Sequence, residues 1–202
     1  MTQLFDELAD TVAACRTRFD SLPGPRGQAL DRLAAFVRAH DPARLVFICT
    51  HNSRRSHMAQ LWAHVAATTS GCDHVETYSG GTEATAFARP AVAAMRRAGF
   101  EIDGDDRAEN PRYHVRIGPD AEPIEVFSKR FDNAPNPRDD FAAVMVCSDA
   151  DANCPVVPGA TDRIALPFDD PKQADGTAHE AATYDARVRE IGTAILTAFT
   201  RA

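Results

Sequence analysis

The sequence predicts an α/β protein: a four-stranded parallel sheet with helices on both faces. Short β-branched and aromatic runs alternate with segments of helical periodicity, a pattern typical of parallel sheets. Three chemically capable residues, Cys49, Cys147 and Asp170, follow three of the predicted strands. Ligands of such folds bind at the carboxyl ends of strands. With 202 residues and 44% hydrophobic content, the chain suits one domain with a sizeable core.

The first 40 residues are predicted to form a helical extension. Apolar side chains recur there at helical spacing in two segments, which a Pro- and Gly-rich break at residues 21–27 separates. Asp41-Pro42 ends the second helix. We therefore divide the chain into an extension, residues 1–40, and a catalytic α/β domain, residues 41–202.

The elements of the α/β domain follow in order along the chain. The expected strands are residues 45–50, 74–79, 141–147 and 163–168, and Gly80-Gly81 is expected to end the second strand. Helical patterns follow the first strand, occupy residues 90–99 and close the chain at residues 185–199. On the first of these helices, Trp62 is expected in the core, whereas His57 and His64 are expected on a solvated face.

Residues 101–140 differ from the rest of the domain because they are rich in Asp, Asn, Pro and Arg. Two alternating segments within them, residues 113–118 and 124–129, are expected to pair as a hairpin around Pro119-Asp120. We interpret this region as an inserted hairpin or flap.

Charge and cysteine content limit the partners and the compartment. The net charge of −7 argues against a nucleic-acid or anionic-membrane partner. No apolar run approaches the ~20 residues of a membrane helix, and the acidic N-terminus lacks a signal-peptide pattern. Five cysteines in a chain of this length do not form a disulfide scaffold, so a cytoplasmic protein is expected, whose cysteines are buried, metal-bound or redox-active. Both a monomer and a dimer are compatible with the sequence.

The loop after the first strand carries the strongest functional pattern. Five residues separate Cys49 from Arg55, and Ser56 follows at the start of a helix. Backbone N–H groups of such a loop can converge on an anion, and the helix start adds positive potential. Arg55 can bind two oxygens of a tetrahedral oxyanion, while the same field favours a Cys49 thiolate. The alternative is a buried cysteine followed by a polar turn. The predicted oxyanion-binding residues are Thr50, His51, Asn52, Ser53, Arg54, Arg55 and Ser56.

The orientations of two side chains in this loop, His51 and Arg54, can also be predicted. We expect the His51 ring to point outward. Arg54 is expected either to add positive field at the mouth of the site or to be a solvated charge.

Two further cysteines leave three alternatives open. Six residues separate Cys147 from Cys154, which precedes Pro155. They are two unrelated core thiols, a metal site or a redox pair. The spacing is longer than that of typical zinc hooks and no His pair accompanies it, so no metal is expected.

The motif VFICTHNSRRSHMAQ resembles the phosphate-binding loop of the low-molecular-weight protein tyrosine phosphatase superfamily, which includes the thioredoxin-coupled arsenate reductases. The resemblance extends to residues 78–100, to CSDADANCPVVPG and to PFDDP. It implies that Asp170, in the Asp-Pro pair, is the general acid that protonates the leaving oxygen. By itself the Asp-Asp-Pro stretch also suits an ordinary turn. CSDADANCP is similar to the segment that carries the two resolving cysteines of the reductases.

The resemblance implies an arsenate reductase of arsenic detoxification. Cys49 would attack arsenate, Cys147 would then form a disulfide with Cys49, and Cys154 would take over that disulfide. Thioredoxin would supply the reducing equivalents, and no tightly bound cofactor is expected. Asn52 and Ser79 match positions that some members arrange around a potassium ion. Several of those members have Glu where this chain has Gln60, a departure that argues against the ion.

Two other functions remain open at this stage. The first is a phosphatase that hydrolyses phosphotyrosine or aryl phosphates through a Cys49 phosphoenzyme. Lys172-Gln173 follows the Asp-Pro pair where phosphatases usually have aromatic residues, although the insertion offers Tyr113, Phe127 and Phe131 as a substitute wall. The second is a non-catalytic module that binds an oxyanion or a partner, against which the intact set of Cys49, Arg55 and Asp170 argues.

Overall fold

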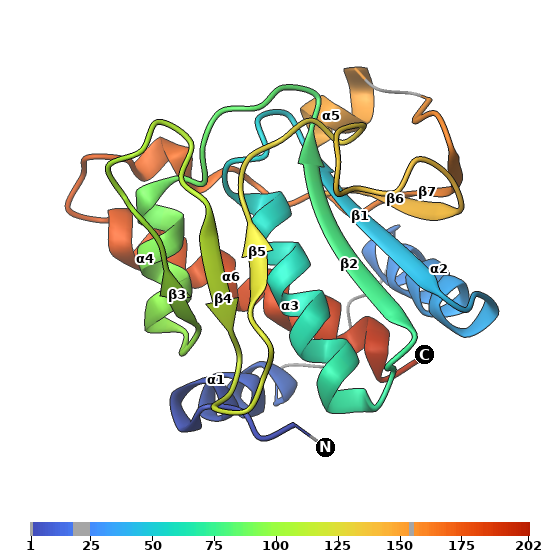
Figure 1. The fold of residues 1–202 in the computed structure, drawn as a ribbon, viewed down its shortest axis with the longest axis horizontal. Helices are drawn as coiled ribbons and strands as arrows, with labels where there is room; N and C mark the ends of the chain where they lie inside the picture. The colour runs from blue at the N-terminus through green and yellow to red at the C-terminus, as the bar shows by residue number, and fades with distance from the viewer. Residues whose placement is uncertain (1, 18–24, 154–155) are drawn as a thin grey trace.

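The predicted parallel sheet is confirmed in the computed structural model, which describes residues 2–17, 25–153 and 156–202. Its strands are β1 (Ala43–Cys49), β2 (Val75–Gly81), β6 (Phe141–Met145) and β7 (Ala160–Ala165), in the spatial order β2-β1-β6-β7. All neighbouring pairs are parallel, so the carboxyl ends of the strands share one edge (Figure 1). Cys49 is the last residue of β1 and Cys147 follows the adjacent strand β6, so both lie at that edge.

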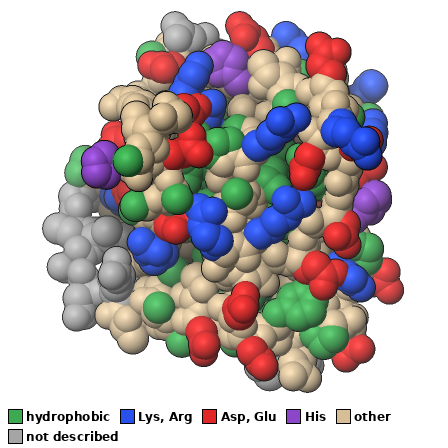
Figure 2. Space-filling model, turned by 90° about the vertical axis from the view of Figure 1, so that its left-hand side faces the viewer, with side chains coloured by type: hydrophobic (Ala, Val, Ile, Leu, Met, Phe, Trp, Pro, Cys, Tyr) green, Lys and Arg blue, Asp and Glu red, His purple; other side chains and the backbone are tan. Residues whose placement is uncertain are grey.

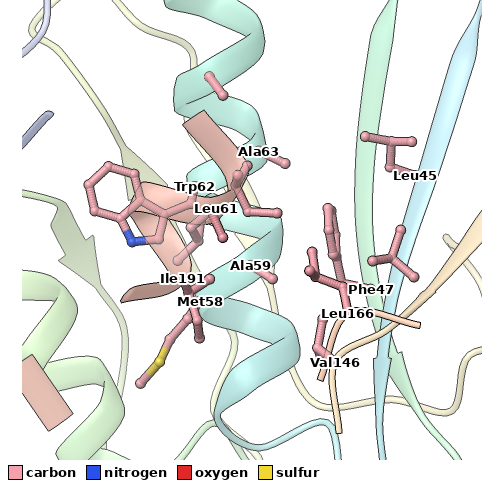
Figure 3. Close-up of a cluster of buried hydrophobic side chains, with 14 of the residues drawn as sticks. Leu45, Phe47, Met58, Ala59, Leu61, Trp62, Ala63, Val146, Leu166 and Ile191 are labelled. Carbon is pink, nitrogen blue, oxygen red and sulfur yellow. The ribbon is translucent and has the colours of Figure 1, made fainter. Parts of the chain in front are cut away.

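Seven helical segments accompany the strands in the part of the chain that the structure describes. They are α1 (Asp6–Arg16), α2 (Pro25–Ala39), α3 (Arg55–Ser70), α4 (Arg89–Arg97), α5 (Ser148–Asn153), the 3-10 helix η1 (Pro171–Ala174) and α6 (Glu180–Phe199). The apolar side of α3 packs against β1, with Ala59 directed toward Phe47 and Ala63 toward Leu45 (Figure 3). Trp62 is fully buried between α3 and α6, as expected. No helix in these described ranges is long and apolar enough to cross a membrane.

The insertion forms a small antiparallel sheet beside the main one (Figure 1). The predicted hairpin is confirmed as β4 (Tyr113–Arg116) and β5 (Ile124–Val126), which pair in antiparallel register. A third strand, β3 (Glu101–Asp103), joins the other side of β4, and the sequence pattern did not predict it. We call residues 101–140 the inserted lobe.

The N-terminal helices pack onto other parts of the molecule. The Phe5 N–H donates to the Ile117 carbonyl of the inserted lobe at 3.0 Å. Arg26 of α2 donates to Glu190 of α6 at 2.9 Å. The helical extension thus contacts both the lobe and the last helix.

Several predicted boundaries are wrong. β2 does not end before Gly80-Gly81: it runs through Gly81, which pairs with Cys49. A Cβ on Gly81 would lie 2.7 Å from the Asn52 nitrogen and from the Thr50 oxygen, so only glycine permits this approach. β7 begins and ends three residues earlier than expected, and the polar segment after Cys147 forms the short helix α5.

Candidate active site

The loop between β1 and α3 has its carbonyl groups bound on the outside. The Cys49 and Thr50 carbonyls accept hydrogen bonds from the backbone N–H groups of Thr82 and Glu83, at 3.2 and 2.8 Å. The Ser53 carbonyl accepts from the Ala88 N–H at 2.9 Å. Within the described ranges, no backbone hydrogen bond outside the regular elements is donated by residues 50–54. These N–H groups are therefore available to an anion, as the sequence predicts.

The Cys49 thiol lies at the base of this loop and is 4% exposed. Its sulfur is 3.1 Å from the Ser56 hydroxyl oxygen. Asn52 Nδ2 donates to the same oxygen at 2.8 Å, so the Ser56 proton is free to point at the sulfur. A thiolate at Cys49 would thus receive a hydrogen bond, as a nucleophile of this kind requires.

The inserted lobe holds the outer side of the loop. Ser128 Oγ donates to the His51 carbonyl at 3.0 Å, and the Lys129 N–H donates to Asn52 Oδ1 at 2.9 Å. Asn110 binds both backbone groups of Ser128, at 2.8 and 3.2 Å. Asn52 has φ 44°, a left-handed conformation that Asn tolerates better than most residues. The lobe therefore stabilises an otherwise unfavourable turn of the oxyanion loop.

Arg55 connects the loop to the predicted acid. Its guanidinium donates to the Phe168 carbonyl at 2.9 Å and to Asp170 Oδ2 at 2.7 Å. Asp170 Oδ1 accepts from the Lys172 N–H at 3.0 Å and so caps η1. Cys49, Arg55 and Asp170 therefore meet at one end of the sheet, as predicted.

Arg54 is not a solvated charge. Its side chain is 13% exposed, Nε donates to the Tyr184 hydroxyl at 2.9 Å, and a terminal nitrogen lies 3.4 Å from Asp175 Oδ2. Burial lowers the pKa of Arg54, but Tyr184, Asp170 and Asp175 outweigh burial, and the net pKa is raised. Arg54 Nε also lies 3.9 Å from Asp170 Oδ1.

Positive charge at the site is local. On the face in Figure 2, Lys and Arg side chains lie interspersed with Asp and Glu, and the chain carries a net charge of −7. An anionic substrate therefore depends on the N–H groups and arginines of this loop.

Cys147 lies beside the loop and is fully buried. Its sulfur is 3.6 Å from Thr50 Oγ1 and accepts a hydrogen bond from the Ala150 N–H at 3.3 Å. Thr50 directly follows Cys49, so the structure brings this second thiol to the nucleophile's loop. Cys154 lies outside the described residues.

The structure tests the predicted orientation of His51 and the predicted exposure of His57. The His51 ring points outward, as expected, and its Nε2 lies 3.6 Å from Glu83 Oε2. The prediction that His57 is solvated is wrong: its ring is fully buried and stacked on Phe87, at 4.2 Å between ring centroids. Burial first, and the charge of Lys129 second, lower the pKa of His57 to about 3. The apolar stripe of α3 did not indicate that His57 is buried, because burial extends over nearly the whole helix and not over that stripe alone.

Tyr113, proposed as part of a phenyl-binding wall, is not available for that role. Its ring is fully buried in edge-on contact with Phe87, and its hydroxyl donates to Asp106 at 2.7 Å. Lys129 and Arg112 lie over the Phe127 ring, at 4.8 and 3.9 Å from its centroid.

The residues matched to a potassium site have other partners in the structure. Asn52 Oδ1 accepts from the Lys129 N–H, and Ser79 Oγ lies 3.2 Å from His57 Nδ1. Gln60 uses its amide nitrogen on the Thr77 carbonyl at 3.1 Å. Lys129, whose backbone N–H binds Asn52, is 4% exposed, and its ammonium lies 3.4 Å from the Phe127 carbonyl. Across the described residues, no three His, Cys, Asp or Glu side chains form a metal-binding group.

A parallel sheet with a cysteine–arginine oxyanion loop and an opposed aspartate defines a class of cysteine-dependent enzymes. Residues 44–112 match the model of the low molecular weight phosphotyrosine protein phosphatase family. The arsenate reductase of Bacillus licheniformis is 34% identical over 151 residues, covering 73% of this chain and 88% of that protein. The arsenate reductase of Bacillus subtilis strain 168 is 33% identical over 149 residues, with the same coverage. The chain therefore belongs to the superfamily of low-molecular-weight phosphatases and arsenate reductases.

Solved structures support the same fold. A low molecular weight phosphotyrosine phosphatase from Vibrio cholerae O395 aligns with a TM-score of 0.53 and 12% identity, covering 77% of this chain and 93% of that one. A low molecular weight protein tyrosine phosphatase from T. tengcongensis aligns with a TM-score of 0.50 and 16% identity, covering 79% and 99%. At these identities the likeness concerns the fold alone.

Several residues that build the site were not predicted from the sequence. Ser128, Asn110 and Thr85 support the loop, and Tyr184 and Asp175 hold Arg54. None of them belongs to a motif with fixed spacing from Cys49. The only signal in the sequence was the composition of residues 101–140, which differs from that of the rest of the domain.

Proposed function

We propose that this enzyme is an arsenate reductase that works through a cascade of thiols. The observation that carries the proposal is the contact between Thr50 Oγ1 and the Cys147 sulfur, which places a second thiol beside the nucleophile's loop. The relatives named arsenate reductase support the same choice. Arsenate has the shape and charge of phosphate, so the N–H groups of the loop and Arg55 suit it.

The first step forms a sulfur–arsenic bond. The Cys49 thiolate attacks arsenic(V) while the N–H groups and Arg55 stabilise the oxyanion. Asp170, placed 2.7 Å from Arg55, donates a proton to the departing oxygen, which leaves as water.

The second step reduces arsenic. The Cys147 thiolate attacks the Cys49 sulfur, so a disulfide forms and the sulfur–arsenic bond breaks with its electron pair on arsenic. Arsenic(V) becomes arsenic(III) and leaves as arsenite, while the two cysteines are oxidised. The N–H of Ala150, which already points at the Cys147 sulfur, stabilises its thiolate.

The third step restores the nucleophile. Cys154 attacks Cys147, which moves the disulfide to the Cys147–Cys154 pair and frees the Cys49 thiolate. A dithiol protein of the thioredoxin class then reduces this pair, in keeping with a cytoplasmic location.

The phosphatase alternative rests on Cys49, Arg55 and Asp170 alone, because they suffice for a phosphoenzyme. Against an aryl substrate, the two residues after Asp170-Pro171, Lys172 and Gln173, are exposed and not aromatic. Tyr113 is buried in the lobe.

The deciding assay couples arsenate reduction to NADPH consumption through thioredoxin and thioredoxin reductase. We expect arsenate-dependent NADPH consumption by the wild type and none by Cys49→Ser. A wild-type enzyme that is inactive in this assay yet hydrolyses p-nitrophenyl phosphate efficiently would refute the reductase and favour the phosphatase.

A further inference from the structure

Arg54, Tyr184 and Asp175 form a hydrogen-bonded cluster beside the acid-bearing segment, in which Tyr184 is buried and Asp175 is exposed. The Tyr184 hydroxyl donates to Asp175 Oδ1 at 2.7 Å and accepts from Arg54 Nε at 2.9 Å. Arg54 also reaches Asp175 Oδ2, at 3.4 Å. The Tyr184 ring is fully buried, so α6 fixes the position of the cluster.

The cluster lies at the ends of a very short segment. Asp170 caps the start of η1 and Asp175 follows its end, with only Pro171–Ala174 between them. Arg54 contacts Asp175 and lies 3.9 Å from Asp170 Oδ1, so a single side chain of the oxyanion loop reaches both ends of η1.

From this arrangement we infer that Arg54 and Tyr184 are positioning residues for the general acid Asp170. The inference rests on the proposed function only in that Asp170 must protonate a leaving oxygen. In the structure Arg55 holds Asp170 directly, at 2.7 Å. When an oxyanion enters the loop, Arg55 turns its donors to the anion and can no longer hold the carboxyl group alone. Arg54, tied to α6 through Tyr184, keeps the acid-bearing segment in place during that exchange.

The contacts of Arg54 distinguish this role from direct anion binding. Its Nε is bound to Tyr184, a terminal nitrogen is directed at Asp175, and its side chain is 13% exposed. Burial first, and the hydrogen bond to Asp175 second, raise the pKa of Tyr184, so its hydroxyl remains a donor throughout the working pH range. These contacts use neither the backbone N–H groups of residues 50–54 nor the Arg55 guanidinium, so an anion can bind to those groups without breaking them.

The test compares kcat with KM in Tyr184→Phe and Arg54→Met. Tyr184→Phe deletes one hydroxyl and preserves the buried ring. Because Asp170 acts only in the transition state, we expect kcat to fall about tenfold in each variant while KM changes less than about twofold. In an Asp170→Asn background, Tyr184→Phe should cause no further loss of kcat, because the residue it positions is absent.

The matched control is Arg97→Met. Arg97 of α4 pairs at 2.6 Å with Asp185 of α6, the residue after Tyr184, and takes no part in the contacts of Arg54, Tyr184, Asp175 and Asp170 described above. This variant should leave both constants unchanged. An unchanged kcat in Tyr184→Phe and Arg54→Met would overturn the inference, as would a raised KM with unaltered kcat, which would make Arg54 an anion ligand.

Both arsenate and p-nitrophenyl phosphate serve as substrates for this test. If arsenate is not reduced but the aryl phosphate is hydrolysed, the proposed reductase fails while the positioning of Asp170 is still measured. If neither reacts in the wild type, both the proposed function and this inference are refuted.

Discussion

The two cysteines that the proposed mechanism brings together lie in very different surroundings. Cys49 lies beneath a loop that the 82–88 segment and the inserted lobe hold from outside, with Asn52 and Ser56 fully buried. Cys147 directly precedes the six-residue helix α5, whose Ser148, Asp149 and Ala152 are exposed. Attack on an oxyanion requires fixed geometry, whereas transfer of a disulfide requires the second thiol to move. The contrast indicates a rigid binding site next to a segment that can rearrange.

The largest expected loss of activity follows from substitution of Cys49 in the oxyanion loop. Cys49→Ser should abolish turnover of arsenate and of aryl phosphate by on the order of 10³-fold or more, because no other residue supplies the nucleophile. Steady-state rates on both substrates measure this, and Cys72→Ser, on the loop after α3, is the control. Appreciable activity in Cys49→Ser would contradict the account.

The second prediction distinguishes the role of Cys147 from that of the oxyanion loop. Cys147→Ser should eliminate repeated turnover of arsenate, because arsenite cannot leave without a disulfide. Hydrolysis of p-nitrophenyl phosphate should change less than about twofold, because water completes that reaction. Equal loss of both activities would contradict this, because it would mean that Cys147 is needed in the oxyanion-binding site itself.

The third prediction concerns His57, buried beneath the loop. Its folded-state pKa of about 3 lies below the unfolded value of about 6.5, so the unfolded chain binds the extra proton first. Stability should therefore fall as the pH drops below about 6.5, by about 2 kcal/mol at pH 5 from this group. Urea unfolding at pH 8 and pH 5 measures the change, and His57→Gln should remove that part of it. If His57→Gln leaves the pH dependence intact, the neutral buried ring is not its source.

The smallest effect is expected from the lobe. Ser128→Ala removes the hydrogen bond to the His51 carbonyl and leaves the Thr85 N–H without its acceptor. We expect a loss of about 1–2 kcal/mol in the free energy of unfolding and a raised KM for arsenate, since the anion-binding loop is less fixed. Ser148→Ala, an exposed serine on α5, should change neither quantity. No change in Ser128→Ala would mean that the lobe does not support the loop.

The part of the site formed by consecutive residues could be predicted from the sequence. The β1 strand, the loop and the start of α3 are contiguous, so the spacing of Cys49, Arg55 and Ser56 sufficed to predict the anion cradle. The parallel sheet was predictable for the same reason, because each strand is followed by its own helix or loop. Asp170 required the family resemblance, since an Asp-Pro pair also suits an ordinary turn.

The support of the site was not predictable because it depends on contacts between distant residues. Ser128 meets His51 across 77 positions, and Arg54 meets Tyr184 across 130. Serine, tyrosine and asparagine at such separations carry no spacing pattern, and only packing brings them together. His57 illustrates the same limit: its type suggested solvent, but Phe87, Ser79 of β2 and Lys129 of the lobe surround its ring.

The most direct test of the central claim uses Cys154→Ser and one equivalent of arsenate, without thioredoxin. We expect one equivalent of arsenite per enzyme and a Cys49–Cys147 disulfide, identified by peptide mapping under non-reducing conditions. Arsenite release without this disulfide, or continued turnover of Cys154→Ser with thioredoxin at the wild-type rate, would contradict it.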